Sequence, residues 1–300
     1  MPAPLTMFLD PWLAVAIAVI GAVVVSRMRN GGVVTAWRVA ALSGAIAALV
    51  VCWLTPLETL AAHYLLSAHV IQLTLVVGVI PALLLLAIPP GSEPLLPGWA
   101  RGPLRAMSHP VLTIVLLNAA LFGVDDLLLL THTPIDIRLY DAAQLGYLAI
   151  AVAFWLPLVD PARRRAVPPM GRLFVILVVA IPQTFGGLLL ALSRRVLYPG
   201  YGRAPRVLLD AATDQRVAGL VLAIAAKAGL LVAFGVILVR LMNDTAEDDD
   251  EDDDGGGGAR RRPQPAPPGR PEWLRHLENG RLRPEPAPPR RRTPPVPLGR

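Results

Sequence analysis

The sequence predicts an all-α fold: a polytopic membrane helix bundle of about seven transmembrane helices, followed by a disordered C-terminal tail. Hydrophobic residues make up 54% of the 300-residue chain, although its C-terminal end is almost free of apolar clusters. The apolar residues therefore concentrate upstream, in runs close to the roughly 20 residues that a helix needs to cross the hydrocarbon. This contrast predicts a transmembrane domain over residues 1–242 and a charged cytoplasmic tail over residues 243–300.

Seven apolar segments approach or meet the length of a membrane span. They cover residues 11–26, 36–54, 61–88, 110–130, 142–159, 173–192 and 217–241. Prolines stand at most of the segment ends, where a missing backbone N–H costs least. Pro81 and Pro182 lie inside segments and predict kinks there. Helices are expected throughout, because a helix satisfies all of its own backbone groups in lipid.

The arginines that flank these segments predict the orientation of the chain. One set of alternate loops holds Arg27, Arg29, Arg38, Arg101, Arg105, Arg163, Arg164, Arg165 and Arg172. The other set holds Arg138, Arg194, Arg195, Arg203, Arg206 and Arg216. Since the richer set should face the cytoplasm, we expect a bacterial inner-membrane protein with its N-terminus outside and its C-terminus cytoplasmic. The loop from Arg194 to Arg216 is an exception to this rule.

The tail has the composition of a chain that does not fold alone. An acidic block over residues 247–254 is followed by four glycines and then by arginine- and proline-rich sequence. Charge blocks and frequent prolines prevent a packed core. The formal net charge is +6, but the arginines lie in this tail and in loops beside helices, so no nucleic-acid partner is expected.

With this topology, polar side chains gather towards the outer ends of the spans. They are His63, His69, Gln72, Asp125, Asp126, His132, Asp141, Gln144, Asp214 and Gln215. Lys227 lies deeper, near the middle of the seventh span. Polar groups within a membrane usually face the bundle interior or a water-filled cavity. The pattern therefore predicts an outward-facing polar chamber.

Each of these residues also has a purely structural interpretation. His69 and Gln72 are three apart on one helix face and would serve equally well in an interhelical hydrogen bond. Asp125 and Asp126 would be solvated at a helix end, and His132 would be a loop histidine. Lys227 would belong to a structural pair. These alternatives stay open from the sequence alone.

The chain lacks the common signatures of enzymes and soft-metal sites. It contains no phosphate-binding loop, no His-Glu-x-x-His, no Gly-x-Ser-x-Gly and no Cys-x-x-Cys. The single cysteine, Cys52, allows no internal disulfide. We therefore expect a protein that is not an enzyme, with no catalytic residues.

Three pairs of segments, in this order and spacing, resemble the CtaG-type cytochrome c oxidase assembly factors. They are residues 64–72 with 80–89, residues 139–143 with 154–158, and residues 193–201 with 214–219. The resemblance covers roughly residues 10–240. It places His69 and Gln72 on the third-span motif, His132 on the histidine before Leu-Tyr-Asp, and Asp214 with Gln215 on an Asp-Gln pair.

The resemblance implies a membrane accessory factor for the assembly of a haem–copper cytochrome c oxidase, with copper delivery to the copper B centre. It implies His69 and His132 as metal ligands, copper as the metal, and the lipid bilayer and oxidase subunits as partners. The sequence departs from the family where a second histidine would follow Gln72, since Leu73 stands there.

Two other functions remain compatible with the sequence. Kinked spans with buried polar groups are also typical of a transporter or permease for a small solute or metal. No internal repeat supports that alternative. A scaffold that holds partners without a metal is the third hypothesis.

Overall fold

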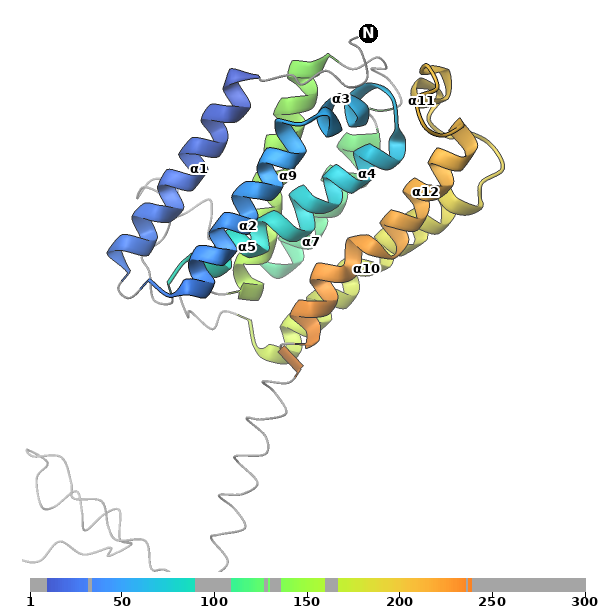
Figure 1. Ribbon diagram of the computed structural model, residues 1–300. Helices are drawn as coiled ribbons and strands as arrows, with labels where there is room; N and C mark the ends of the chain where they lie inside the picture. Colours follow the sequence, from blue (N-terminus) through green and yellow to red (C-terminus); the bar gives the residue numbers. More distant parts are fainter. Residues whose placement is uncertain are drawn as a thin grey trace, which may run out of the picture. The chain divides into compact units, whose positions relative to one another are not determined.

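The computed structural model describes residues 10–31, 34–89, 109–126, 129, 136–159, 167–235 and 237–238. Every regular element in these ranges is helical, which confirms the predicted all-α class (Figure 1). The elements are α1 (Pro11–Asn30), α2 (Ala36–Trp53), α3 (Pro56–His63), α4 (Leu66–Thr74), η1 (Leu75–Val79), α5 (Ile80–Ala87), α7 (Pro110–Ala119), η2 (Ala120–Asp125), α9 (Ile137–Val159), α10 (Pro169–Leu192), α11 (Pro199–Arg203), α12 (Ala211–Ala223) and η3 (Ala225–Lys227). The predicted tail, residues 243–300, lies outside the described residues.

Six helices of the described part are long and apolar enough to cross a membrane. They span Pro11–Asn30, Ala36–Trp53, Leu66–Ala87, Ile137–Val159, Met170–Leu192 and Ala211–Gly235. They overlap six of the predicted spans, so the chain is a multi-pass membrane protein. The remaining prediction, residues 110–130, corresponds to a shorter apolar helix, Pro110–Asp125. The number of seven is reached only if this shorter helix also crosses.

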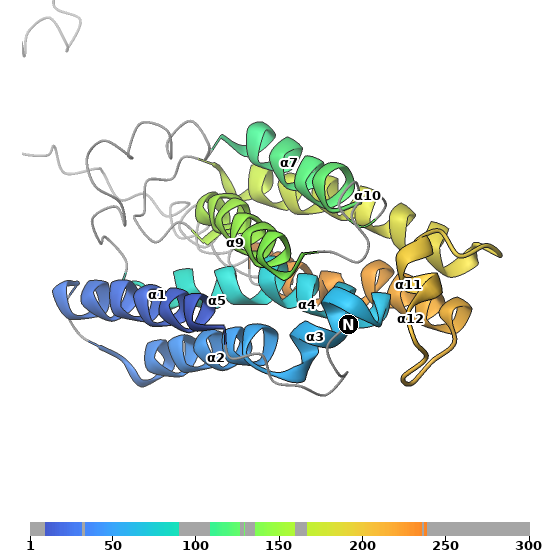
Figure 2. The ribbon, with the colours of Figure 1, turned by 90° about the horizontal axis from the view of Figure 1, so that it is seen from above.

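The helices pack against one another in pairs, and some of these pairs are distant in the sequence. α10 and α12 lie side by side, and α4 packs on α12 (Figures 1 and 2). α5 contacts α2 and α9, and α7 contacts α9 and α10. The short helices α3 and α11 meet at one end, where the Tyr201 hydroxyl donates a hydrogen bond to the Ala61 carbonyl over 2.6 Å.

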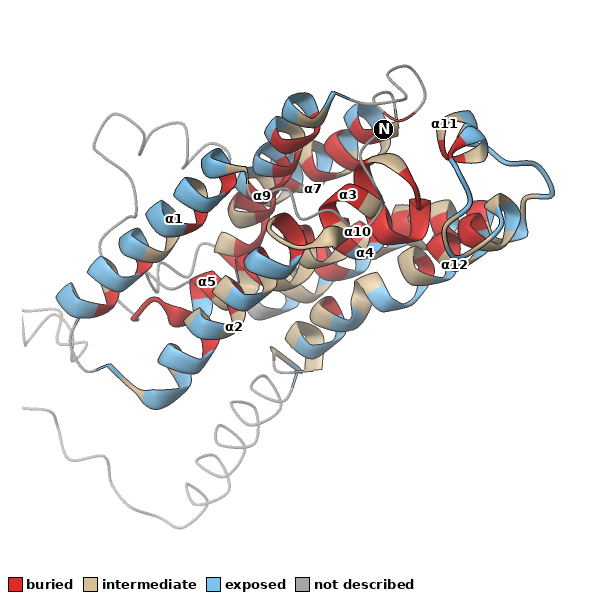
Figure 3. Cartoon of the chain, turned by 45° about the horizontal axis from the view of Figure 1, so that its top comes forward, coloured by how far each residue is buried: buried red, intermediate tan, exposed pale blue. Residues whose placement is uncertain are grey.

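Burial follows the pattern expected of a membrane bundle, in which both the buried and the exposed face of a helix are apolar. In α1 the buried side chains form one stripe, Leu13, Ile17, Val24 and Met28. The opposite face is exposed and also apolar, with Trp12 and Val15 (Figure 3). A helix that is hydrophobic all round suits contact with lipid on one side and protein on the other. The Asp10 carboxylate caps the start of α1 by accepting a hydrogen bond from the Trp12 N–H over 3.1 Å.

The closest helix crossing joins α10 to α12 through glycine. A Cβ built on Gly219 would lie 2.4 Å from the Ala191 nitrogen and 2.5 Å from the Gly187 oxygen. Gly187 meets the backbone of Ala223 and Gly219 in the same way. Each helix thus has a small residue four positions after its glycine, the pattern that allows two membrane helices to touch backbone to backbone.

The third predicted span is interrupted, which corrects the expectation of one continuous helix over residues 61–88. The helix is interrupted at Tyr64 and Leu65, between α3 and α4. The span then contains a π-helical turn, η1, just before Pro81. A π-helical turn is rare and occurs mostly as a single-turn bulge inside an α-helix.

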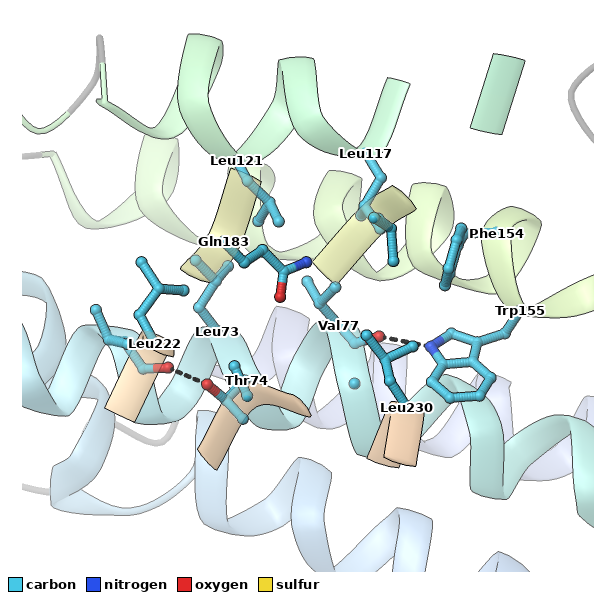
Figure 4. A pocket seen from close by; sticks show the side chains of 14 residues that line it. Leu73, Thr74, Val77, Leu117, Leu121, Phe154, Trp155, Gln183, Leu222 and Leu230 are labelled. Carbon is cyan, nitrogen blue, oxygen red and sulfur yellow. Dashed lines mark hydrogen bonds between the residues drawn. The ribbon is translucent and has the colours of Figure 1, made fainter. Parts of the chain in front are cut away.

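Pro81 has no N–H, so the carbonyl of Val77 loses its helical donor. The indole N–H of Trp155 replaces it, over 2.9 Å (Figure 4). We expect Trp155→Phe to lower the free energy of unfolding by about 1–3 kcal/mol, because a buried carbonyl is then left unpaired. Thermal unfolding in detergent measures this. Trp12→Phe, which changes a side chain 65% exposed, is the matched control and should leave stability unchanged.

Candidate functional site

Side chains from three helical elements and one backbone carbonyl from a fourth form one buried hydrogen-bonded chain, here called the His69 relay. The relay comprises the Cys52 carbonyl, Gln72, Tyr140, His69 and Asp125. The Gln72 amide nitrogen donates to the Cys52 oxygen over 2.8 Å, and the Tyr140 hydroxyl donates to the Gln72 Oε1 over 2.5 Å. The His69 Nδ1 lies 3.0 Å from the Tyr140 oxygen. The His69 Nε2 lies 2.9 Å from Asp125 Oδ2.

Local helix geometry positions each member of the relay. His69 and Gln72 project from the same face of α4, three residues apart, as the sequence predicted. Tyr140 comes from α9, and Asp125 ends the π-helical turn η2. Such turns widen a helix by one residue and occur frequently at functional sites. The structure therefore brings together three of the predicted residues with one, Tyr140, that was not predicted.

The relay is closed to solvent. Gln72 is 0% exposed, His69 is 1% exposed and Asp125 is 6% exposed. Buried polar groups are tolerated where hydrogen bonds satisfy them, and both ring nitrogens of His69 have such partners. These residues fill the space between helices rather than line an open chamber.

Asp126 serves a different partner from its neighbour Asp125. It accepts a short hydrogen bond from the Tyr198 hydroxyl, in the segment between α10 and α11. Asp125 and Asp126 are therefore not merely solvated at a helix end. One joins the relay, and the other fastens η2 to the α10–α11 segment.

The predicted Asp214–Gln215 pair binds backbone rather than other chamber residues. The Asp214 carboxylate accepts hydrogen bonds from the N–H groups of Leu66 and Ser67, over 2.7 and 3.0 Å, and from the Ser67 hydroxyl. It thus caps the N-terminus of α4 from another helix. Gln215 accepts from the Leu197 N–H over 2.7 Å and donates to the Arg195 carbonyl over 2.9 Å. Asp214 therefore holds the start of α4 in place, and Gln215 holds the segment between α10 and α11.

Lys227 is explained by its own helix. Its ammonium donates to the Leu222 carbonyl over 2.6 Å, just before the 3₁₀ turn η3 interrupts the helix. This contact supplies a donor at a break in the helical ladder. Lys227 makes no hydrogen bond with the His69 relay. His132, the second predicted metal ligand, lies outside the described residues.

A buried acidic pair lies between α3 and α9. The carboxyl groups of Glu58 and Asp141 are adjacent, and both side chains are buried. Burial, together with the neighbouring Asp141 carboxyl, raises the pKa of Glu58 from 4.5 to about 9. Two adjacent carboxyl groups share one proton, so the pair holds a proton at pH 7. Asp141 was predicted for the chamber, but Glu58 was not.

Glu58 gives the fold a pH dependence. Its pKa is higher in the folded chain than in the unfolded chain, so between about pH 4.5 and 9 the folded state binds more protons. The free energy of unfolding should therefore fall as pH rises through this window. Glu58→Gln, which keeps a neutral hydrogen-bonding group, should flatten the fall and raise stability at pH 8–9. Thermal unfolding from pH 5 to 9 measures the slope.

Asp210→Asn is the control for that experiment. Asp210 is an exposed helix cap whose hydrogen bonds to Thr213 and Ala212 lower its pKa, so it is already ionised across the window. Its replacement should leave the slope unchanged. An identical slope in Glu58→Gln and the unmodified chain would show that Glu58 does not hold the proton.

An apolar cavity lies apart from the relay. Among its lining residues are Leu73, Val77, Leu117 and Trp155, with the amide of Gln183 directed into it (Figure 4). None of the predicted chamber residues lines this cavity. The cavity borders both η1 and the break at η3, because Gly78 and Ala226 also contribute to its wall.

Comparison with known proteins identifies the family of this chain. A family model described as cytochrome c oxidase caa3 assembly factor (Caa3_CtaG) matches residues 18–244, which include the whole His69 relay. Searches of curated proteins and of solved structures found no match. Because the family model covers well over half of the sequence, the chain belongs to the cytochrome c oxidase caa3 assembly factors.

Proposed function

We propose that this chain helps to mature a haem–copper cytochrome c oxidase by presenting copper at His69 to the oxidase subunit that receives it. The His69 relay supports the proposal, because it brings the His69 imidazole within 2.9 Å of the Asp125 carboxylate. The relay lies within the residues that match the oxidase assembly factor family. Imidazole nitrogen suits copper, and an adjacent carboxylate favours a cation. Delivery to the copper B centre is the step that this role implies.

Completion of the site requires a further ligand. Within the described ranges, no three His, Cys, Asp or Glu side chains are grouped to hold a metal ion. His132 follows Asp125 and Asp126 closely in the sequence. We therefore include His132 in the proposed site, as the partner of His69 and Asp125.

The proposed orientation puts this site on the extracytoplasmic side of the bacterial inner membrane. α1 carries Arg27 and Arg29 in its last turn. At the opposite end of α1, the N-cap Asp10 lies close enough to Glu58 for its charge to raise the pKa of Glu58. Positive charge accumulates at cytoplasmic ends. The N-terminus is then outside and the C-terminus cytoplasmic. Cysteine labelling from either side of intact cells checks this topology.

Copper binding by the purified protein tests the role of the site. We expect His69→Ala and His132→Ala each to weaken binding, since each removes a nitrogen ligand. His109→Ala, at the start of α7, is the control and should bind like the unmodified protein. Equal binding in all four proteins would remove the histidine site.

A transporter for a small solute or metal is the second candidate, and one observation favours it. The cavity of Figure 4 lies beside two interrupted helices, an arrangement that transporters use for binding. Uptake into proteoliposomes discriminates between the two functions. Flux that is lost on filling the cavity, as in Gly78→Leu, would favour transport, and no flux would favour the assembly role.

A further inference from the structure

The hydrogen bonds of the relay fix the position of each proton, starting from Gln72. Its nitrogen lies 2.8 Å from the Cys52 carbonyl oxygen, which can only accept. The amide NH₂ group must therefore face Cys52, and the amide oxygen must face Tyr140. Both Gln72 and Cys52 are buried.

The orientation of Gln72 determines the direction of the Tyr140 hydroxyl. The two oxygens are 2.5 Å apart, and only the phenol has a hydrogen to place between them. The single hydroxyl proton therefore points to Gln72. The phenol oxygen can then only accept from the His69 Nδ1, 3.0 Å away, so Nδ1 must carry a proton.

The other ring nitrogen, Nε2, faces Asp125 Oδ2 over 2.9 Å with one proton between them. It is the only ring nitrogen whose proton can leave without breaking the rest of the relay. Histidines that bind metals usually donate their second N–H to a fixed acceptor, which sets the tautomer of the ring.

We propose that Tyr140 and Gln72 are positioning residues that hold His69 in its Nδ1-protonated form and so reserve Nε2 for copper. The proposal rests on the proposed function for the identity of the metal, but not for the tautomer. If copper were bound at Nε2, the proton between Nε2 and Oδ2 would have to leave, and the Nδ1 proton would stay on the ring.

Nitrogen NMR of protein labelled with ¹⁵N-histidine tests the tautomer without copper. The chain has five histidines, and the His69 signals are assigned by their loss in His69→Ala. We expect a protonated Nδ1 in the unmodified protein. Gln72→Leu removes the acceptor of the Tyr140 proton, so the phenol turns to Nδ1 and the ring shifts to the Nε2-protonated form. Gln72→Glu, neutral when buried, accepts from Tyr140 and donates to Cys52, and should restore the original pattern.

Titration with Cu(II) alone tests the consequence for binding. We expect Tyr140→Phe and Gln72→Leu to weaken copper binding by about 10- to 100-fold, with Gln72→Glu close to the unmodified protein. Tyr201→Phe removes a similarly buried phenol hydrogen bond, to Ala61, and should bind copper normally.

The outcomes separate this inference from the proposed function. A protonated Nε2 with a bare Nδ1 in the unmodified protein would overturn the inference, whatever the copper result. So would a tautomer that is unchanged in Gln72→Leu. Absence of copper binding together with a protonated Nδ1 would reject the copper role and leave the positioning of His69 intact.

Discussion

Gly219→Leu is expected to prevent α12 from packing on α10 and to leave little folded protein in the membrane. A side chain there would start 2.4 Å from the Ala191 nitrogen and 2.5 Å from the Gly187 oxygen, and neither backbone atom can move aside. Overpacking costs about 1–3 kcal/mol where side chains can adjust, so the cost should exceed about 3 kcal/mol here. The yield of monodisperse protein in mild detergent, with its melting temperature, measures the effect.

Gly146→Ala is the matched control for the crossing. Gly146 also lies inside a membrane-spanning helix, α9, but a Cβ there would meet nothing within 4 Å. Alanine should therefore be neutral or raise stability by up to about 1 kcal/mol, because it favours the helix. A Gly219→Leu protein as stable as the Gly146→Ala protein would contradict backbone contact between α10 and α12.

Asp214→Ala should cause the second-largest loss of stability. It leaves the buried N–H groups of Leu66 and Ser67 and the Ser67 hydroxyl without their acceptor. Each orphaned buried donor costs about 1–3 kcal/mol, so the total should be about 3 kcal/mol or more. Asp214→Asn keeps one acceptor oxygen, so its free energy of unfolding should lie between those of Asp214→Ala and the unmodified protein. Chemical unfolding in detergent measures the series.

Asp210→Ala gives the comparison within the same region. Asp210 caps its own helix, α12, through the N–H groups of Ala212 and Thr213, but these groups are exposed. Loss of an exposed cap typically costs about 1 kcal/mol. Equal losses in Asp210→Ala and Asp214→Ala would show that Asp214 does not hold the start of α4.

The break in the third span illustrates what sequence patterns miss. Residues 61–88 are apolar enough for one helix, and composition gives no sign of the interruption at Tyr64 and Leu65. The interruption is stable because Asp214, 148 positions from Leu66, supplies the missing cap. A contact over that separation has no local signature. The length of the apolar runs, in contrast, predicted seven spans, and six of these correspond to long apolar helices, because membrane thickness alone sets the length of a span.

Some of the polar residues of the site were predicted from the sequence, and others were missed. The spacing of His69 and Gln72 placed both on one face of α4, and topology brought Asp125 near them. Tyr140 was missed because a tyrosine beside an apolar helix is usually unremarkable, and Glu58 was missed because it stands between two predicted spans. Only the folded structure shows that Tyr140 meets His69 and Gln72, and that Glu58 lies beside Asp141.

The copper content of the oxidase in cells is the most direct measure of the proposed role of the His69 relay. Cytochrome c oxidase would be purified from a strain that lacks this protein and from the same strain supplied with the unmodified protein or with His69→Ala. We predict oxidase with haem but too little copper in the deletion strain, restored by the unmodified protein and not by His69→Ala. Full copper in the oxidase of the deletion strain would contradict the proposed function.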